Sequence, residues 1–374
     1  MAAEPYFLLR EAQAADEAAI FGLARHLNTL NLPPEPDYIE GLLTRSVASF
    51  APGPFDPDRR LLFALEAPDG RVVGTSMIHA QHGTYDDPHV YFTVSTEERH
   101  AKLHFPDGRV QHIHMEHTML HLGLTYHGPT ELGGLVLDPG LRRHPQKLGR
   151  LLSLSRFVFI AAHRPWFRDR LLAELLPPLF RGPEGATKSP LWDALGHRFT
   201  GLSYDEADRL SRFDKTFIWN LFPRMPIHAS LLPEEVQAAI GTVGPNTVGA
   251  LRLLESVGFA YAGRVDPFDG GPHVEAPTDQ VTLVRATRRY ATRPGQPGPS
   301  ALPAIVAVTA DVVPRFRAVF THVTVDPDDP DVLVVDPAAL ERLALGRPGE
   351  AGEVLAALRP VRRATDRRPS SLAG

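Results

Sequence analysis

Apolar and polar residues recur along the chain at the spacings of both helices and strands. Residues 16–27 place apolar side chains at helical spacing behind acids in the first turn, which predicts a helix. Residues 60–67 and 71–77 are strand-like runs joined by a turn with Asp69-Gly70 at its centre, which predicts a β-hairpin. The same spacing predicts strands at 6–10, 132–137 and 261–265 and helices at 149–163, 233–240 and 248–257. Because the two kinds of element interleave, we predict an α/β (α+β) fold, a mixed sheet flanked by helices.

A segment rich in proline and glycine, residues 291–303, divides the chain into two unequal parts. Such a composition is typical of a linker. Residues 1–290 are then expected to form one large domain, and β-rich runs within 304–366 predict a small C-terminal β module. Residues 367–374 are expected to form a flexible tail.

The composition is that of an ordinary folded protein, and it removes several chemistries. Of the 374 residues, 43% are hydrophobic and 22% are charged, which excludes wholesale disorder. The 36 prolines are twice the usual usage of ~5%, and most of them are expected in loops. There is no cysteine, so a disulfide, a thiolate metal site and a cysteine nucleophile are excluded.

Charge and hydropathy argue against nucleic-acid and membrane partners. The 39 Lys and Arg against 44 Asp and Glu give a formal charge of -5, whereas a general nucleic-acid binder carries a basic excess. The longest apolar run, near residues 157–162, is far shorter than the roughly 20 residues that span a bilayer. The N-terminus has no basic start followed by an apolar stretch, so no signal peptide is visible. We therefore expect a cytoplasmic protein.

The strand predicted at 132–137 leads into a basic loop and then into a helix. Four cations follow it with no acid among them: Arg142, Arg143, Lys147 and Arg150. A helix N-terminus exposes unpaired N–H groups and a partial positive charge, so an anion such as a diphosphate fits there. Gly149 would let a ligand approach the backbone. A solvated basic loop with a packing glycine is the alternative, because short glycine-containing loops match by chance.

A second stretch, residues 245–259, favours the anion site. It predicts a helix that Asn246 caps and that ends at Gly258 in a left-handed conformation. Together with Gln146-x-x-Gly149, this stretch resembles the GNAT-type N-acyltransferases.

That resemblance implies an acyl-CoA site on three elements. The backbone of the strand would meet the pantetheine arm, the 146–150 loop would bind the pyrophosphate, and the helix after Asn246 would flank the cofactor. The strand residues concerned are Leu135, Val136 and Leu137. The loop departs from the family pattern at Leu151, where Gly or Ala is usual.

Six blocks between residues 131 and 276 narrow the resemblance to the arginine N-succinyltransferase family. They stand in family order and near family spacing: Glu131-Leu…Leu-Asp138-Pro, Leu151-Leu-Ser-x-Ser-Arg156-Phe, Ser189-Pro-x-Trp192-Asp193-Ala-Leu-Gly196, Lys215-x-Phe-Ile, Pro226-Ile227, and Phe268-Asp269-Gly270-Gly271-Pro272-x-x-Glu275. Residues 1–130 match only in general pattern. The resemblance implies a GNAT-like domain over 1–290, and the linker and the C-terminal module also fit this family's layout.

The activity implied by the resemblance is acyl-CoA-dependent transfer of a succinyl or other acyl group to the α-amine of arginine or a related amine. Succinyl-CoA or acetyl-CoA would be the co-substrate, and no metal is expected. Backbone N–H groups of 133–137 would polarise the thioester carbonyl, and the amine would attack directly. The alternative is a catalytically weak or inactive paralogue that binds CoA or acts as a structural subunit. Paired subunits within the family imply a homo- or hetero-oligomer with a paralogous chain.

The family's proton acceptor is a histidine in a Gly-x-Val-His-Pro context, and the matching position here is Gly244. A glycine cannot move a proton, and a positioned base contributes about 10²–10⁴-fold. His228 is the nearest candidate replacement, with a surface or packing histidine as the alternative. The family's Arg-Gly after its Ala-Glu strand is also replaced, here by Leu-Leu-Pro-Pro at 175–178.

Charge selects the candidate substrate-binding residues. A guanidinium or an amine calls for a carboxylate, and four acids lie in family-like stretches: Glu174, Asp193, Asp269 and Glu275. Each of them could instead cap an element or face solvent. The distal carboxylate of succinyl-CoA calls for a cation, for which Arg156 and Lys215 are candidates.

Seven histidines lie within 28 residues: His100, His104, His112, His114, His117, His121 and His127. His112-x-His114 on a strand would point both rings to one face, where zinc could bind. Exposed alternating histidines without a metal are the alternative, and we predict no metal.

Overall fold

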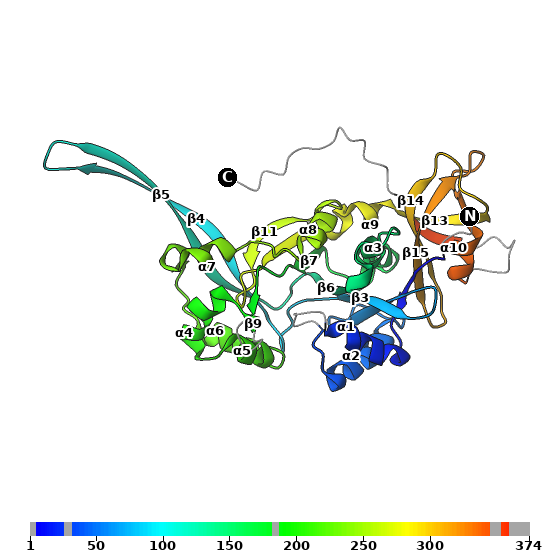
Figure 1. Ribbon diagram of the computed structural model, residues 1–374, viewed down its shortest axis with the longest axis horizontal. Coiled ribbons are helices and arrows are strands. Elements are labelled where there is room, and N and C mark those ends of the chain that lie inside the picture. The colour runs from blue at the N-terminus through cyan, green and yellow to red at the C-terminus, as the bar shows by residue number, and fades with distance from the viewer. Residues whose placement is uncertain (1–4, 26–31, 182–186, 345–352, 359–374) are drawn as a thin grey trace.

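The computed structural model describes residues 5–25, 32–181, 187–344 and 353–358. Figure 1 shows an elongated molecule with a central sheet and its helices, a long hairpin that projects from one end, and a group of short strands at the other end. The predicted α/β fold, a mixed sheet flanked by helices, is confirmed. None of the described helices is long and apolar enough to cross a membrane.

Fifteen of the described strands form one continuous sheet in the order β10-β5-β4-β11-β12-β7-β6-β3-β2-β1-β15-β14-β17-β13-β16. The strands before residue 280 are β1 (Leu8–Glu11), β2 (Arg60–Glu66), β3 (Val72–His79), β4 (His89–His104), β5 (Val110–Thr125), β6 (Thr130–Leu137), β7 (Arg170–Glu174), β10 (Ile227–His228), β11 (Ala260–Val265) and β12 (Pro272–Pro277). The later strands are β13 (Thr287–Pro294), β14 (Leu302–Thr309), β15 (Phe316–Val325), β16 (Val332–Val335) and β17 (Glu353–Leu358). A separate ladder pairs β8 (Phe180–Arg181) with β9 (Thr187–Lys188).

The helices lie on both faces of this sheet. The α-helices are α1 (Glu17–Ala24), α2 (Pro36–Ser49), α3 (Leu148–Ala162), α4 (His197–Thr200), α5 (Tyr204–Ser211), α6 (Thr216–Leu221), α7 (Glu234–Ala239), α8 (Val248–Glu255), α9 (Thr282–Ala286) and α10 (Pro337–Arg342). The shorter turns are η1 (Ala14–Asp16), η2 (Pro139–Leu141), η3 (Arg164–Trp166), the π-helical η4 (Trp192–Gly196), η5 (Ala229–Leu231) and η6 (Thr278–Gln280).

Elements predicted from hydrophobic spacing appear close to their expected bounds. The hairpin of β2 and β3 turns at Gly70, whose φ of 85° a residue with a side chain rarely adopts. The predicted helix at 149–163 is α3, and the predicted helix at 248–257 is α8. The prediction that Asn246 caps α8 is wrong, because Thr247 occupies the N-cap position.

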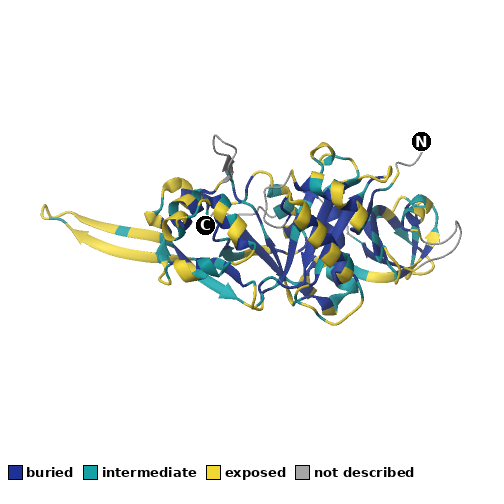
Figure 2. Cartoon of the chain, turned by 90° about the horizontal axis from the view of Figure 1, so that it is seen from below, coloured by how far each residue is buried: buried dark blue, intermediate teal, exposed yellow. Residues whose placement is uncertain are grey.

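The helix α3 is the centre of the core. Eleven of its 15 residues are buried, and Phe159 packs edge-on against Phe63 (5.3 Å between ring centroids) and Phe316 (5.0 Å). These contacts join the central strands to the C-terminal strands through one helix. Figure 2 shows this buried centre and, in contrast, the exposed outer half of the β4–β5 hairpin. Burial of α3 fixes the loop that precedes it relative to the end of β6.

The C-terminal strands close into a small ring. The strand β15 pairs with β14, β14 with β17, β17 with β13, and β13 with β16, which returns to β15. The predicted linker at 291–303 begins inside β13, where Tyr290 and Thr292 are buried at alternate positions. This two-residue period continues into the proline- and glycine-rich segment, whose composition concealed it.

The ring also shares the main sheet, because β15 pairs with β1. Of the predicted module at 304–366, the structure describes 304–344 and 353–358, and the predicted tail at 367–374 lies outside the described residues.

Candidate active site

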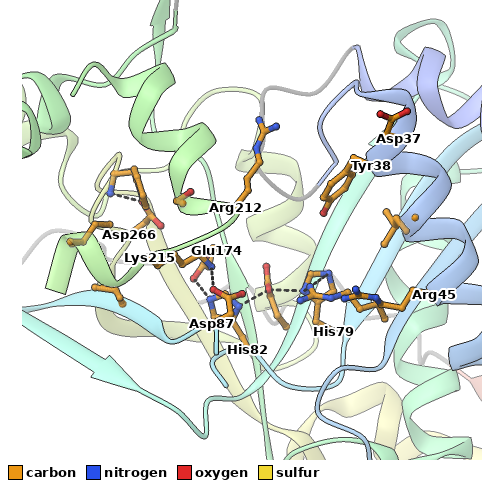
Figure 3. Close-up of a pocket in the computed structure, with 18 residues that line it drawn as sticks. Asp37, Tyr38, Arg45, His79, His82, Asp87, Glu174, Arg212, Lys215 and Asp266 are labelled. Atoms are coloured by element: carbon orange, nitrogen blue, oxygen red, sulfur yellow. Dashed lines mark hydrogen bonds and ion pairs between the residues drawn. The ribbon is translucent and has the colours of Figure 1, made fainter. Parts of the chain in front are cut away.

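A pocket of about 380 Å³ lies between the central strands and the helices α2, α5 and α6 (Figure 3). Its polar wall contains Asp37, Tyr38, Arg45, Arg60, His79, His82, Asp87, Glu131, Glu174, Ser211, Arg212, Lys215 and Asp266. Apolar side chains, among them Leu42, Val90 and Phe268, complete the lining. A concave site with many convergent charged groups is suited to a small polar ligand.

Strand register explains why these groups meet. Residues paired across adjacent strands share a face of the sheet, as do residues two apart on one strand. Arg60 pairs with His79, and His79 pairs with Glu131. Glu131 in turn pairs with Leu172, which stands two residues before Glu174 on β7. Glu174 pairs with His273. A row of polar side chains therefore crosses β2, β3, β6, β7 and β12 on one face.

Glu131 is the first centre of this row. Its Oε2 lies 3.2 Å from Nδ1 of His79 and 3.0 Å from Nδ1 of His82, and its side chain is almost fully buried. Burial and the neighbouring Arg60 lower the pKa of His79 to about 4. Burial also works to lower the pKa of His82, but Glu131 and Glu174 outweigh it, and the pKa of His82 is raised. The pKa values of the two imidazoles are therefore shifted in opposite directions.

Glu174 is the second centre. Its Oε1 lies 3.2 Å from Nε2 of His89, 3.3 Å from Nε2 of His273 and 3.6 Å from Nε2 of His82. Burial works to raise the pKa of Glu174, but the surrounding histidines, led by His273, lower it to about 2. Burial lowers the pKa of His89 to about 3 and also lowers that of His273. An ionised carboxylate is thus flanked by two imidazoles, His89 and His273, whose pKa values burial lowers.

Cations and further acids occupy the remaining wall of the pocket. Lys215, just before α6, places Nζ 3.4 Å from Oδ1 of Asp87. Arg212, just after α5, donates to Oδ2 of Asp208 at 3.1 Å. Burial and the charge of Glu174 raise the pKa of Asp266 to about 7. The pocket thus presents both charges, as recognition of an amino acid with ammonium and carboxylate groups requires.

The strand β6 changes its course beside the pocket. It pairs with β7 only at Thr130 and Glu131, and its register with β3 shifts between Thr75 and Met77. Gly134 takes a φ of 56° within this bulge, and the Thr75 hydroxyl donates to its carbonyl oxygen at 3.0 Å. A Cβ at position 134 would lie 3.0 Å from Cβ of Met77, so a side chain there would be tightly confined. Beyond Glu131, β6 therefore leaves its ladder with β7 and bulges.

Arg156 supports this bulge from below. It belongs to α3 and its side chain is buried. Its Nη1 donates at 3.4 Å to the carbonyl oxygens of Met77 and Gly133. Burial lowers the pKa of Arg156 to about 9. Arg156, a candidate for the distal carboxylate of succinyl-CoA, is thus buried against backbone carbonyl oxygens of β3 and β6.

The predicted acyl-CoA residues gather around the end of β6 and the start of α3. Leu135 and Leu137 are half-buried against the main core, and Val136 is buried on the opposite face. In the basic loop the four predicted cations are exposed and Gln146 is half-buried: Arg142, Arg143, Lys147 and Arg150. A Cβ at Gly149 would meet nothing within 4 Å, so the backbone there is open to a ligand. Asn246 is exposed just before α8.

Gly244 lies in a position that has no room for a side chain. A Cβ there would lie 2.6 Å from the carbonyl oxygen of Pro177 and 3.0 Å from that of Leu176. The backbone N–H of Gly244 donates to the same Leu176 carbonyl at 2.8 Å. The two departures from the family pattern, at Gly244 and at 175–178, therefore contact each other.

Four other predicted site residues lie away from the pocket lining. His228 is half-buried on β10, with its ring 5.9 Å from that of His117. Asp193 lines a different hollow beside α7. Asp269 is buried behind Asp266, where it accepts from the backbone N–H of Gly271 at 2.7 Å, and Glu275 accepts from Arg170 at 2.8 Å. Of the predicted substrate residues, Glu174 and Lys215 line the pocket.

Most of the charged residues of the pocket were not predicted from the sequence. Among them are Arg60, His79, His82, Glu131 and Asp266, and the buried His89 and His273 beside Glu174 were not predicted either. A usable signal was present, because several of these polar residues stand at the ends of otherwise apolar strands. The dense histidine segment drew attention away from it. In the structure, His100 and His114 of that segment stack at 4.3 Å on the exposed hairpin, with Glu98 beside them.

Comparisons with known proteins give this geometry a context. The family described as "Arginine N-succinyltransferase beta subunit" matches residues 7–283. A protein of Pseudomonas aeruginosa named arginine N-succinyltransferase subunit beta is 32% identical over 342 residues, which cover 90% of this chain and 95% of the relative. An arginine N-succinyltransferase of Yersinia pestis is 35% identical over 283 residues, covering 74% of this chain and 76% of the relative.

A solved structure has the same overall fold. It is described as arginine/ornithine succinyltransferase subunit AI from Pseudomonas aeruginosa, and it is 25% identical to this chain with a TM-score of 0.75. The superposition covers 95% of this chain and 99% of that structure. The likeness therefore includes the C-terminal strands as well as the central sheet.

Proposed function

The chain belongs to the arginine N-succinyltransferase family of GNAT-like acyltransferases, and we propose that it transfers a succinyl group from succinyl-CoA to the α-amine of arginine or a related amino acid. The observation that carries this proposal is the charged pocket beside the point where β6 leaves β7. There an amino acid would meet carboxylates and cations together, next to the strand on which the family resemblance places the thioester.

The wall of the pocket supports an amino-acid acceptor. Glu174 and Asp37 offer carboxylates to an amine or a guanidinium, and Glu174 stays ionised because its pKa is lowered. Lys215, Arg212 and Arg45 offer cations to the acceptor's carboxylate and to the distal carboxylate of a succinyl group. Acetyl-CoA, the other donor that the resemblance implies, has no distal carboxylate and would leave one of these cations without a ligand partner.

The acyl-CoA would lie along β6 towards the start of α3. Backbone N–H groups of 133–137 beyond the last β6–β7 pair would polarise the thioester carbonyl. The exposed cations of the loop, with the N-terminus of α3, would hold the pyrophosphate. Collapse of the tetrahedral adduct would release CoA as a thiol and leave an amide on the acceptor.

The amine must lose a proton in this reaction, and position 244 has no side chain to accept it. His228, the predicted replacement, lies outside the pocket lining. We assign proton removal instead to the imidazole and carboxylate groups around Glu131 and Glu174. These groups lie in the pocket where the amine would be bound, which a general base requires.

The names of the relatives support two further proposals. The relatives described as subunits favour an oligomer, formed either with a second copy or with a paralogous chain. A CoA-dependent enzyme of amino-acid metabolism would work in the cytoplasm, where its co-substrate is found. No finding supports the alternative of a purely structural subunit.

A thiol-release assay tests the proposed function. Succinyl-CoA and acetyl-CoA would each be combined with arginine, ornithine, agmatine and Nα-acetylarginine. We expect release of CoA with succinyl-CoA and arginine or ornithine, less with agmatine, which lacks the carboxylate, and none with Nα-acetylarginine, whose amine is blocked. Tight CoA binding by folded protein without turnover of any pair would overturn the proposal and favour the structural-subunit alternative.

A further inference from the structure

Three imidazole nitrogens converge on one carboxylate oxygen in the pocket. Nε2 of His82, His89 and His273 lie 3.6, 3.2 and 3.3 Å from Oε1 of Glu174. The four residues come from the loop after β3 and from β4, β12 and β7, so the arrangement does not follow from one local motif. Acyl transfer to an amine does not require such a cluster.

Two of these histidines, His89 and His273, are almost fully buried beside Glu174. The side chains of His89 and His273 are 1% and 0% exposed, and neither ring nitrogen of either residue makes a hydrogen bond of normal geometry. Buried polar atoms are almost always satisfied, and an exception in a native site calls for a ligand, a water or an ion. One carboxylate oxygen has two lone pairs, so Oε1 of Glu174 cannot accept a hydrogen bond from all three imidazoles at once, and this crowding is suited to a shared ion.

The spacing of the cluster is that of metal ligands. Tetrahedral bonds of roughly 2.0–2.1 Å to zinc place neighbouring ligand atoms about 3.3–3.4 Å apart. The distances from Glu174 to His89 and His82 lie close to that value, and the ligand atoms of all three residues lie within 4.8 Å of one another. The rings of His82 and His89 are 4.2 Å apart between centroids.

The second nitrogen of His82 is held as in known metal sites. Its Nδ1 lies 3.0 Å from Oε2 of the buried Glu131, which leaves Nε2 directed to Glu174. A carboxylate behind a ligating histidine fixes its ring and raises its basicity. We propose that His82, His89 and Glu174 bind one divalent cation of the zinc class, with Glu131 as the outer carboxylate.

This inference goes beyond the proposed acyl transfer, and binding can be measured without any substrate. A cation at this place would disfavour an incoming ammonium and favour the neutral amine, which is the nucleophilic form. Because Glu174 and His82 would then be ligands, the carboxylates left to bind the amine and take its proton would be Asp37 and Asp266 of the same pocket.

The chain offers a matched control in its exposed hairpin. Glu98, His100 and His114 also place their ligand atoms within 4.8 Å of one another, but their side chains are 58%, 69% and 48% exposed. A control variant, His100→Asn with His114→Asn, removes that cluster and leaves the pocket intact.

The experiment measures Zn²⁺ and Co²⁺ binding by the full chain, first stripped with a chelator. Isothermal titration gives the stoichiometry and affinity, and the visible absorption of bound Co²⁺ reports a low-symmetry nitrogen and oxygen ligand set. We expect one tight site in the parent and in the hairpin control. Glu131→Gln should weaken binding by roughly 10–100-fold, and His89→Gln should weaken it more, because it removes a ligand.

Circular dichroism and thermal unfolding confirm that each variant is folded, and Glu131→Gln keeps the test usable if His89→Gln is not. Absence of a tight site in the parent, or loss of the site in the hairpin control with retention in His89→Gln, would overturn the proposal. Failure of the metal site leaves the acyl-transfer assay unaffected. Failure of acyl transfer likewise leaves the metal titration unaffected.

Discussion

Two regions of this chain are rich in histidine, and they differ in everything except that residue. The hairpin of β4 and β5 carries histidines at close sequence spacing on strands whose outer half faces solvent (Figure 2). Around the pocket, His79, His82, His89 and His273 come from separate parts of the sequence and are buried around Glu131 and Glu174. Figure 3 shows His79, His82 and Glu174 of this group. Burial, and not density along the chain, gives an imidazole a shifted pKa and a fixed partner.

The strand β4 connects the two regions. His89 at its start is 1% exposed and lies against Glu174, while His100 further along is 69% exposed and stacks on His114. The same strand thus changes from a buried wall to a solvated ribbon within a few residues. If the chemistry is confined to the buried part, substitutions there should have larger effects than substitutions on the hairpin.

The largest effect is expected from Glu174→Gln. Removing the ionised carboxylate at the centre of the imidazoles should lower kcat/KM for acyl transfer by about 10²–10⁴-fold, as loss of proton-transfer or positioning groups does. Thiol release measures this, with Glu98→Gln on the hairpin as the matched control that keeps full activity. Equal losses in both variants would contradict the division into a working pocket and a solvated ribbon.

The next effect is on the pH dependence of stability. The folded-state pKa values of His79 and His89 are lowered to about 4 and 3 from 6.5. Below pH 6.5 the unfolded chain therefore binds protons that the folded chain does not, so the free energy of unfolding should fall as the pH falls from 6.5 towards 4 and 3. Denaturant titration across this range measures the slope.

The raised pKa of His82 has the opposite sign. Its stabilising contribution is present below pH 6.5 and is lost as the pH rises through its raised folded-state pKa. His89→Gln should flatten the acid slope, whereas the hairpin variant His100→Asn with His114→Asn should retain it. An acid slope that the hairpin variant abolishes would locate the titrating groups in the wrong region.

A smaller effect, on the free energy of unfolding, should distinguish Gly244 from Gly149. Gly244→Ala places a methyl group 2.6 Å from the carbonyl oxygen of Pro177 and should lower the free energy of unfolding by about 1–3 kcal/mol. Gly149→Ala meets nothing within 4 Å and should leave stability nearly unchanged. Urea unfolding of both variants checks this, and a neutral Gly244→Ala would refute the steric explanation for the missing histidine.

The smallest effect is expected when the hairpin is shortened. Glu97 and His117 pair across β4 and β5, so residues 98–116 can be replaced by Asn-Gly, which suits a two-residue hairpin turn. We expect unchanged kcat/KM and an unchanged free energy of unfolding, because nearly all of the removed part is exposed. Loss of activity in a folded, shortened chain would show that the ribbon contributes to the reaction.

Local patterns in the sequence determined much of this protein. Hydrophobic spacing gave the helix α3, the hairpin of β2 and β3 and the interleaving that defines an α/β fold. Ordered blocks of residues gave the family, and through it Glu174 and Lys215, which line the pocket. These signals are short-range, since periodicity and turn chemistry act over a few residues.

The place of the polar residues was decided only by the tertiary structure. His79, Glu131, Glu174 and His273 share one face because four strands pair in one register, and nothing local in the sequence specifies that register. Gly244 has no room for a side chain because the backbone of Leu176 and Pro177, which are distant along the chain, packs against it. Short-range patterns in the sequence therefore determined the fold, the family and two pocket residues. Long-range strand pairing and burial decided which histidines became part of the site.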